Sequence, residues 1–206
     1  MSAPTETSDE QLMLAYARGD ATAFDALYAR HESALLRFVR RLLGRALAAQ
    51  ADEVFQDTWL RIIGARERFV AEPGGASWKT WAFTIAHHAA MDRLRVSGRE
   101  VSLPDAPDDA ADPLDWLQDR LDLAHPSAED LAFWRAAGQQ LLDCLEVLPA
   151  PQRAAFLLHH EDGASVEDLA RRLALPFETA KSRLRYALQK LRGCMRGYLV
   201  VLEARP

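Results

Sequence analysis

Several features that would indicate an exported or membrane-bound protein are missing from this chain of 206 residues. It contains only two cysteines, Cys144 and Cys194, and they lack Cys-x-x-Cys spacing. No apolar run approaches the roughly 18 residues of a membrane-spanning helix, and the polar N-terminus MSAPTETSDEQ does not resemble a secretion signal. We therefore expect a cytoplasmic protein without membrane insertion. Its cysteines should be reduced, with one of them in the core, and a redox pair is the less favoured alternative.

Motifs for metal binding and catalysis are also missing. The nearest candidates are the adjacent pairs His87–His88 and His159–His160, with Glu161 after the second pair. Adjacent residues on a helix diverge by about 100°, so each pair could offer one ligand to a site, and no His-Glu-x-x-His or Cys-His spacing occurs. We expect no metal, no cofactor and no enzymatic activity. A metalloenzyme built from these side chains is an alternative that metal analysis would test.

Positive charge is scarce overall, because the net charge is -5, but it is unevenly distributed. The stretch 100–130 holds ten acidic residues against Arg120 alone, together with four prolines. Such a segment cannot form one continuous helix or a packed core, and we interpret residues 99–127 as an acidic linker. A short docking helix within it could use Leu114, Trp116, Leu117, Leu121 and Leu123. The prediction is an all-α protein with two small helical domains, residues 1–98 and 128–206.

The sequence after Gly163 is typical of a helix-turn-helix. Ser165 and Asp168 form a capping box for a helix from about Val166 to Ala174, and Pro176 disfavours its continuation. Thr179, or Pro176 itself, then opens a second helix. Its inward stripe is Ala180, Leu184, Leu188 and Leu191, which leaves Lys181, Ser182, Arg183 and Arg185 facing outward. Eight basic residues against one acid from Arg171 to Arg196 suit a helix that enters a DNA major groove, although a solvated basic face is the plainer alternative.

The N-terminal half shows four helices. A capping box of Ser8 and Gln11 starts a helix through Ala17, and Asp20 caps a long one that ends at Gly44. A third helix covers about residues 51–66, with Val54, Phe55, Trp59, Ile62 and Ile63 as its core stripe. Its first turns contain Asp52, Glu53, Gln56 and Asp57, and acids there also suit the helix dipole.

The fourth helix, capped by Ser77 and ending near Val96, interleaves aromatic and basic residues. Trp78, Trp81 and Phe83 lie at different angles around its axis, so at least one ring should face outward beside Lys79, His87, His88, Arg93 and Arg95. Exposed rings next to cations suit single-stranded nucleic acid, whose bases stack on them. A core helix with basic side chains at its surface is the alternative.

Taken in order, these segments resemble the sigma factors of bacterial RNA polymerase, specifically the small two-domain extracytoplasmic-function (ECF) group. The matching segments are GDATAFDALYARH, ADEVFQDTWLRI, WKTWAFTIAHHAAMDRLR and LEVLPAPQRAAFLLHHEDGASVEDLARRLALPFETAKSRLRYAL. They lie within residues 9–96 and 128–198, and the acidic stretch falls where that group has its variable connector. One motif alone would be moderate support, but this order and spacing are specific.

The resemblance implies three contact sites and a specificity subunit that performs no covalent chemistry. Core polymerase, through its beta-prime clamp and beta subunit, would be the main partner, with promoter DNA as duplex and as non-template single strand, and an anti-sigma factor as inhibitor. The clamp would contact Asp52, Glu53, Gln56 and Asp57. The minus-10 strand would contact Trp78, Lys79, Trp81, Thr84, His87, His88 and Arg95. The minus-35 duplex would contact Thr179, Lys181, Ser182, Arg183, Arg185 and Tyr186.

Two positions depart from the family pattern. Thr84 replaces a frequent Arg, and His88 lies where many members carry Asn. The bases that are read here therefore cannot be inherited from relatives. The main alternative function is a stand-alone helix-turn-helix regulator, which would bind duplex DNA tightly by itself but would leave the acidic cluster and the Trp-rich helix unexplained.

Overall fold

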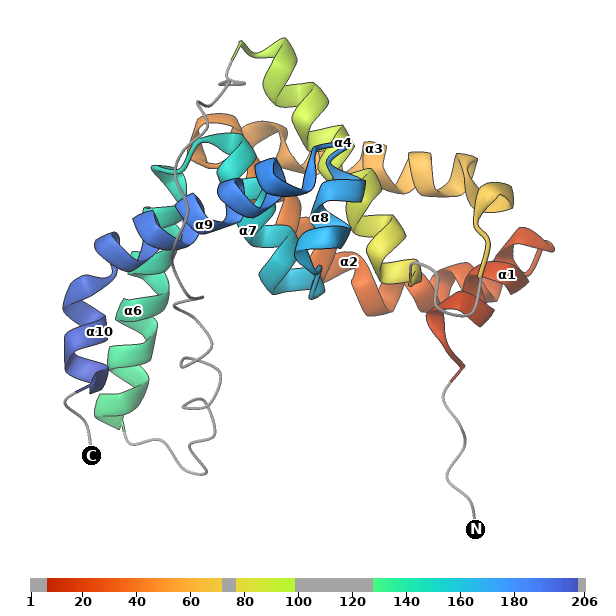
Figure 1. Cartoon of the computed structure of the whole chain (residues 1–206). Helices are drawn as coiled ribbons and strands as arrows, with labels where there is room; N and C mark the ends of the chain where they lie inside the picture. Colours follow the sequence, from red (N-terminus) through yellow and green to blue (C-terminus); the bar gives the residue numbers. More distant parts are fainter. Residues whose placement is uncertain (1–6, 72–76, 99–127, 204–206) are drawn as a thin grey trace. The chain divides into compact units, whose positions relative to one another are not determined.

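A computed structural model describes residues 7–71, 77–98 and 128–203 of the chain. Across these ranges the secondary structure is helical and contains no strand, which confirms the predicted all-α class (Figure 1). The chain divides into two compact units, residues 1–99 and 100–206. The acidic stretch 99–127, including the expected docking helix at 114–123, lies outside the described residues. No helix in the described ranges is long and apolar enough to cross a membrane.

The described part of the N-terminal unit contains four α-helices, and local capping sets where three of them begin. Ser8 and Gln11 bond reciprocally at the start of the first helix, Asp20 accepts from the Thr22 amide at 3.0 Å, and Ser77 accepts from the Thr80 amide at 3.1 Å. The third helix ends at Gly64, two residues earlier than expected, because a short 3-10 turn follows it. The elements are α1 (Asp9–Ala17), α2 (Ala21–Leu43), η1 (Arg45–Gln50), α3 (Ala51–Gly64), η2 (Arg66–Arg68) and α4 (Trp78–Val96).

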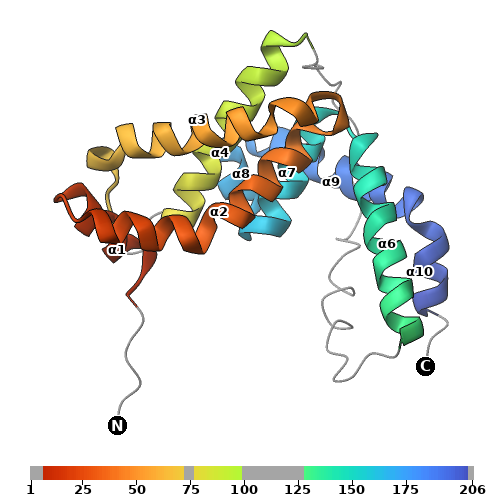
Figure 2. The ribbon, with the colours of Figure 1, turned by 180° about the vertical axis from the view of Figure 1, so that it is seen from behind.

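Helix α2 is the centre of this unit and packs against α1, α3 and α4 (Figures 1 and 2). Its apolar stripe supplies most of the core, because Leu27, Leu35, Phe38 and Leu42 are fully buried. Trp59 of α3 joins α2 through ring contacts with Phe24 and Tyr28, whose centroids lie 5.6 and 4.9 Å away. Helices α3 and α4 therefore both pack on α2. The residues expected to contact the clamp and those expected to contact the minus-10 strand thus lie within the same helical unit.

The C-terminal unit contains α6 (Ala128–Glu146), α7 (Ala150–Asp162), α8 (Val166–Arg172), α9 (Phe177–Cys194) and α10 (Arg196–Glu203). Helix α9 packs against α6, α7 and α8, so its apolar stripe is enclosed on several sides. Helix α10 lies beside α6 in both views, and the rings of Phe133 and Tyr198 join them at 5.6 Å (Figures 1 and 2). The long basic helix α9 thus contacts each of the other four helices described in this unit.

The expectation of two reduced cysteines is wrong in this structure. Cys144 on α6 and Cys194 at the end of α9 form a disulfide, with their Cα atoms 5.9 Å apart, and the Gln140 amide lies 3.6 and 3.7 Å from the two sulfurs. The two cysteines are 50 residues apart in the sequence, which does not indicate that they lie close together. They meet because α6 packs against α9. Cys144 is buried, as expected for one of the pair, and Cys194 is exposed.

Candidate nucleic-acid interface

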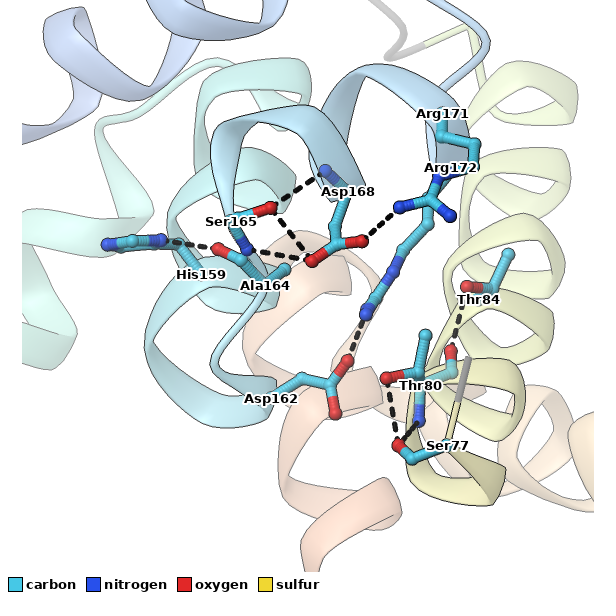
Figure 3. A network of polar contacts seen from close by, with 10 residues as sticks. All are labelled: Ser77, Thr80, Thr84, His159, Asp162, Ala164, Ser165, Asp168, Arg171 and Arg172. Atoms are coloured by element: carbon cyan, nitrogen blue, oxygen red, sulfur yellow. Dashed lines mark hydrogen bonds and ion pairs between the residues drawn. The ribbon is translucent and has the colours of Figure 1, made fainter. Parts of the chain in front are cut away.

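Helices α8 and α9 form the helix-turn-helix, and the start of α8 is fixed by its capping box (Figure 3). The Ser165 hydroxyl accepts from the Asp168 amide at 3.1 Å and donates to the Asp168 carboxylate at 2.8 Å, while the Ser165 amide donates back at 3.1 Å. The Ser165 hydroxyl is the main cause of a lowered pKa for Asp168, and Arg171 adds to it. The predicted capping box is confirmed, and α8 begins at Val166 as expected.

The turn between the two helices begins and ends two residues earlier than expected for a second helix that starts at Thr179. Helix α8 ends at Arg172 instead of Ala174, and Ala174 adopts a positive φ of 51° that closes the turn. Helix α9 begins at Phe177 with Pro176 as its N-cap, so the expected start at Thr179 is wrong by two residues, and Pro176, the other expected start, directly precedes the helix. The inward stripe is confirmed, because Ala180, Leu184, Leu188 and Leu191 are all buried. These four residues fix which side of α9 faces away from the core.

The outward side of α9 holds the six residues expected at duplex DNA. Lys181 is exposed, and the other five, Thr179, Ser182, Arg183, Arg185 and Tyr186, are partly exposed. The Arg185 guanidinium lies 5.5 Å from the centre of the Tyr186 ring. Arginine can donate two hydrogen bonds to a guanine edge, and lysine or serine can bind phosphates, so this face offers the donors that major-groove binding requires.

Trp78 occupies a different place from the one expected of a base-contacting ring. It is fully buried, and its ring lies 4.5 Å from His31 and 6.3 Å from Trp59. Its backbone amide donates to the Glu10 carboxylate at 3.0 Å, which is the main cause of the lowered pKa of Glu10. As the first residue of α4, Trp78 locks that helix onto α1 and α2. The expectation that it contacts DNA directly is therefore corrected to a packing role.

The remaining residues of α4 are distributed along its length. Trp81 is partly exposed and packs against Phe69, with ring centroids 5.4 Å apart. The Lys79 ammonium lies 5.6 Å from the buried Phe83 ring, and the Thr84 hydroxyl donates to the Thr80 carbonyl at 2.8 Å. His88 and Arg95 are exposed, whereas His87 is buried. Of the three aromatic residues Trp78, Trp81 and Phe83, only Trp81 retains accessible ring surface.

The acidic residues of α3 lie together on one exposed side, and each charged one has an arginine partner. Arg40 contacts Asp52 at 3.0 Å, and Arg93 of α4 contacts Glu53. Arg61 contacts Asp57 at 2.9 Å and Asp92 of α4 at 3.0 Å. Burial alone would lower the pKa of Arg61, but its hydrogen bonds to Asp92 and Asp57 raise it. Gln56 is exposed between these pairs.

A residue that the sequence analysis missed follows these residues on the same side of α3. Leu60 is 66% exposed, and it follows Gln56 by one helical turn. Its position could have been found from the helical spacing of Glu53, Gln56 and Leu60. A groove of about 350 Å³ runs next to it between α3 and α4, lined by Glu53, Val54, Asp57, Arg61, Ala89, Asp92, Arg93 and Val96. An exposed leucine flanked by carboxylates suits a basic, amphipathic partner surface.

The histidines show no metal-binding arrangement. Among the described residues, no group of three or more His, Cys, Asp or Glu side chains could hold an ion. His159 instead contacts the Ala164 carbonyl through Nδ1 at 2.6 Å, beside Gly163, which ends α7 with a φ of 73° (Figure 3). That contact holds the backbone at Ala164, just before the N-cap of α8, so His159 has a structural role next to the helix-turn-helix.

Comparison with known protein families gives two matches that cover most of both units. Residues 27–100 match the sequence profile of Sigma-70 region 2, and residues 138–191 match that of Sigma-70, region 4. The first range contains α3 and α4 with the acidic side and the Trp-rich helix. The second contains α8 and α9.

Similar proteins extend along almost the whole chain. The ECF RNA polymerase sigma factor SigM of Mycobacterium tuberculosis is 32% identical over 197 residues, which cover 94% of this chain and 87% of the relative. The ECF RNA polymerase sigma factor SigK of the same species is 29% identical over 197 residues, covering 93% of this chain and 96% of the relative.

Two solved structures share the fold. The sigma factor RpoE, solved with the anti-sigma factor NepR from Bartonella quintana, has a TM-score of 0.58 and 24% identity, covering 85% of this chain and 98% of that one. CnrH, solved with the cytosolic domain of CnrY, has a TM-score of 0.57 and 22% identity, covering 93% and 99%. At these identities the likeness is one of fold.

Proposed function

Because this chain belongs to the ECF group of sigma-70 family RNA polymerase sigma factors, we propose that its three surfaces divide the work of promoter-specific initiation. The protein is an alternative sigma factor, which directs polymerase to promoters. We assign core binding to α3, the opened strand to α4 and the upstream duplex to α9. In this scheme the chain contributes binding and positioning, performs no covalent chemistry and works in the cytoplasm. The family membership favours this function over a stand-alone regulator.

The observation that carries the proposal is the exposed side of α3. Asp52, Glu53, Gln56 and Asp57 precede the exposed Leu60 there by one to two helical turns, and a DNA-binding protein that acts alone does not need an acidic surface with an exposed leucine. We propose that the polymerase clamp docks on this side. Arg40, Arg61 and Arg93 hold the carboxylates in place before binding, which lowers the conformational entropy lost on docking.

The strand-binding role rests on the part of α4 that remains accessible. We propose that an unstacked base packs on Trp81, whose ring also contacts Phe69. Lys79, Thr84, His88 and Arg95 would bind the backbone and base edges along the same helix. Trp78 keeps a different role, because its burial holds the first turn of α4 in position.

The duplex-binding role rests on α9. We propose that Thr179, Lys181, Ser182, Arg183, Arg185 and Tyr186 enter the major groove of the minus-35 element, with α8 crossing the backbone. The capping box of Ser165 and Asp168 fixes α8, and the buried stripe of α9 turns the basic side outward. Arg183 and Arg185 would supply bidentate contacts to guanine.

An anti-sigma factor is the proposed inhibitory partner. The sigma factor RpoE, which shares the fold, was solved with the anti-sigma factor NepR, and CnrH was solved with the cytosolic domain of CnrY. We extend that class of partner to this chain, without assigning the residues that it contacts. Pull-down from the native cell, with identification of one small co-purifying protein beside polymerase subunits, tests this extension.

Reconstituted transcription tests the function, and a charge reversal tests the α3 assignment. Core polymerase plus this chain should initiate from a cognate promoter. Glu53→Lys should weaken binding to core by at least about tenfold, because the new lysine would face the basic partner surface that we expect at this side of α3. Asp25→Lys on α2 is the matched control, since Asp25 is also an exposed helical acid and the charge change is the same. No promoter-specific initiation on any promoter would overturn the function. Equal losses in the two variants would overturn only the docking site.

A further inference from the structure

One residue of α9 does not fit the basic character of its surface. Glu178 is the only acid between Arg171 and Arg196, a stretch that holds eight basic residues. An acid on a surface that approaches phosphates opposes binding to every DNA sequence, because the phosphate backbone supplies most of the non-specific affinity. Such a residue is explained either by a structural role, which includes the favourable placement of an acid at a helix N-terminus, or by a specific partner on the DNA.

The contacts of Glu178 give it little structural role. Its side chain is 71% exposed, and the Lys181 ammonium lies 4.0 Å from its carboxylate, at the outer limit for an ion pair. An exposed ion pair at this distance contributes little to stability. It does not cap the helix, because the N-cap is Pro176 and no side-chain bond closes this end. Asp168 on α8, by contrast, is engaged by both Ser165 and Arg171.

Glu178 lies near the N-terminus of α9, on the side of the helix that we assign to the DNA groove. It precedes Ser182 by four residues and Arg185 by seven, so the three side chains lie on one side of the helix, opposite Ala180 and Leu184. In helix-turn-helix proteins the N-terminal residues of the second helix contact base edges. Glu178 is the second residue of α9, within its first turn.

We propose that Glu178 is a specificity-determining residue that accepts a hydrogen bond from the 4-amino group of a cytosine in the minus-35 element. A carboxylate can only accept, and in the major groove the amino groups of cytosine and adenine are the donors, with cytosine the usual partner of Glu. The charge of Glu178 thus penalises sites without the cytosine. This inference rests on the proposed role of α9 and adds one base preference to it.

The test uses the complete polymerase holoenzyme and a promoter library randomised across the minus-35 element. The wild-type chain selects cytosine at one position by about tenfold, the discrimination that a good base contact gives. Glu178→Ala removes the preference at that position alone. Glu178→Gln moves it toward adenine, because an amide both donates and accepts and therefore matches the adenine edge.

Glu167 provides the matched control. It is exposed and is the second residue of α8, as Glu178 is of α9, so Glu167→Ala and Glu167→Gln make the same changes near a helix dipole without altering base selection. Replacing the selected cytosine by 2-pyrimidinone, which lacks the amino group, lowers wild-type initiation about tenfold and leaves Glu178→Ala unchanged. Promoter-specific initiation with the same base selection in both Glu178 variants overturns this inference alone. Absence of promoter-specific initiation overturns the proposed function with it.

Discussion

At the scale of single residues, neighbouring aromatic side chains of one helix have different surroundings. Trp78 and Trp81 are three residues apart in a segment whose composition indicated strand binding throughout. The tertiary contacts of Trp78 with His31 and Trp59 leave no surface for a base, whereas Trp81 is only partly covered by Phe69. Substitution of each ring in turn can therefore distinguish a role in packing from a role in strand binding.

We predict opposite phenotypes for Trp78→Ala and Trp81→Ala. Trp78→Ala should destabilise the protein by about 3–5 kcal/mol, the usual cost of removing a buried aromatic ring. Trp81→Ala should leave the unfolding midpoint nearly unchanged and reduce open-complex formation about tenfold, because one stacked base is lost. Thermal unfolding and permanganate reactivity of the promoter strand measure the two effects. Normal strand opening in a folded Trp81→Ala variant would contradict the stacking role.

The capping box of α8 makes a pH-dependent contribution to stability. Ser165→Ala should cost about 1 kcal/mol at neutral pH. The folded pKa of Asp168 is lowered mainly by Ser165, so this part of the stability is present above the ordinary aspartate pKa of about 4 and is lost as the pH falls through the folded value. The difference in unfolding midpoint between wild type and Ser165→Ala should therefore narrow between pH 7 and pH 3. A constant difference across that range would exclude the carboxylate as its source.

At the scale of elements, helices far apart in sequence are joined by a few specific contacts. The basic helix α9 is linked to α6 at its end by Cys144–Cys194 and supported along its length by α7 and α8. In the N-terminal unit, Arg61 and Arg93 link α3 to α4 through carboxylates on both helices. In each unit, a surface assigned to DNA or polymerase is thus tied to a neighbouring helix.

We predict that reduction of the disulfide destabilises the C-terminal unit. A bridge that spans 50 residues contributes about 4 kcal/mol in the chain-entropy description, and measured contributions are commonly about 2–4 kcal/mol. Thermal unfolding with and without dithiothreitol should show a lower midpoint for the reduced chain. Cys194→Ser should unfold at the reduced midpoint in both buffers. Two reactive thiols in the folded chain under oxidising buffer would show that the bridge does not form in solution.

At the scale of the whole molecule, the proposed promoter contacts are divided between the two compact units. Helix α4 lies in residues 1–99 and α9 in residues 100–206. Neither unit offers both contacts, and each presents a single helix to DNA. The distance between the two promoter elements would then be set by the polymerase to which the chain binds.

This division predicts that the chain alone binds promoter duplex weakly. At physiological salt we expect a dissociation constant of about micromolar or weaker for the full chain, in the range of non-specific binding. The holoenzyme should bind the same duplex in the nanomolar range that specific complexes reach. Fluorescence anisotropy with and without core polymerase measures both values. Nanomolar, sequence-specific binding by the chain alone, or by residues 128–206, would favour the stand-alone regulator.

Much of the fold could be predicted because its signals are local. Capping at Ser8, Asp20, Ser77 and Ser165 depends on residues two or three positions away, and the inward stripe of α9 depends only on helical spacing. The order of the matching segments likewise indicated the family. The helix ends at Gly64 and Arg172 were missed by two residues, because a 3-10 turn and a residue with positive φ give weak sequence signals.

The tertiary structure decided what depends on long-range packing. Trp78 and Trp81 look alike in sequence, and only the positions of α1, α2 and α3 bury one of them. Cys144 and Cys194 meet because α6 packs against α9, and the carboxylates of α3 are paired because Arg93 reaches them from α4. The sequence by itself determined which helices form and which of their sides are apolar, since both follow from spacing along one chain segment. Which side chains remain accessible to DNA or polymerase follows from contacts between segments, and those exist only in the folded protein.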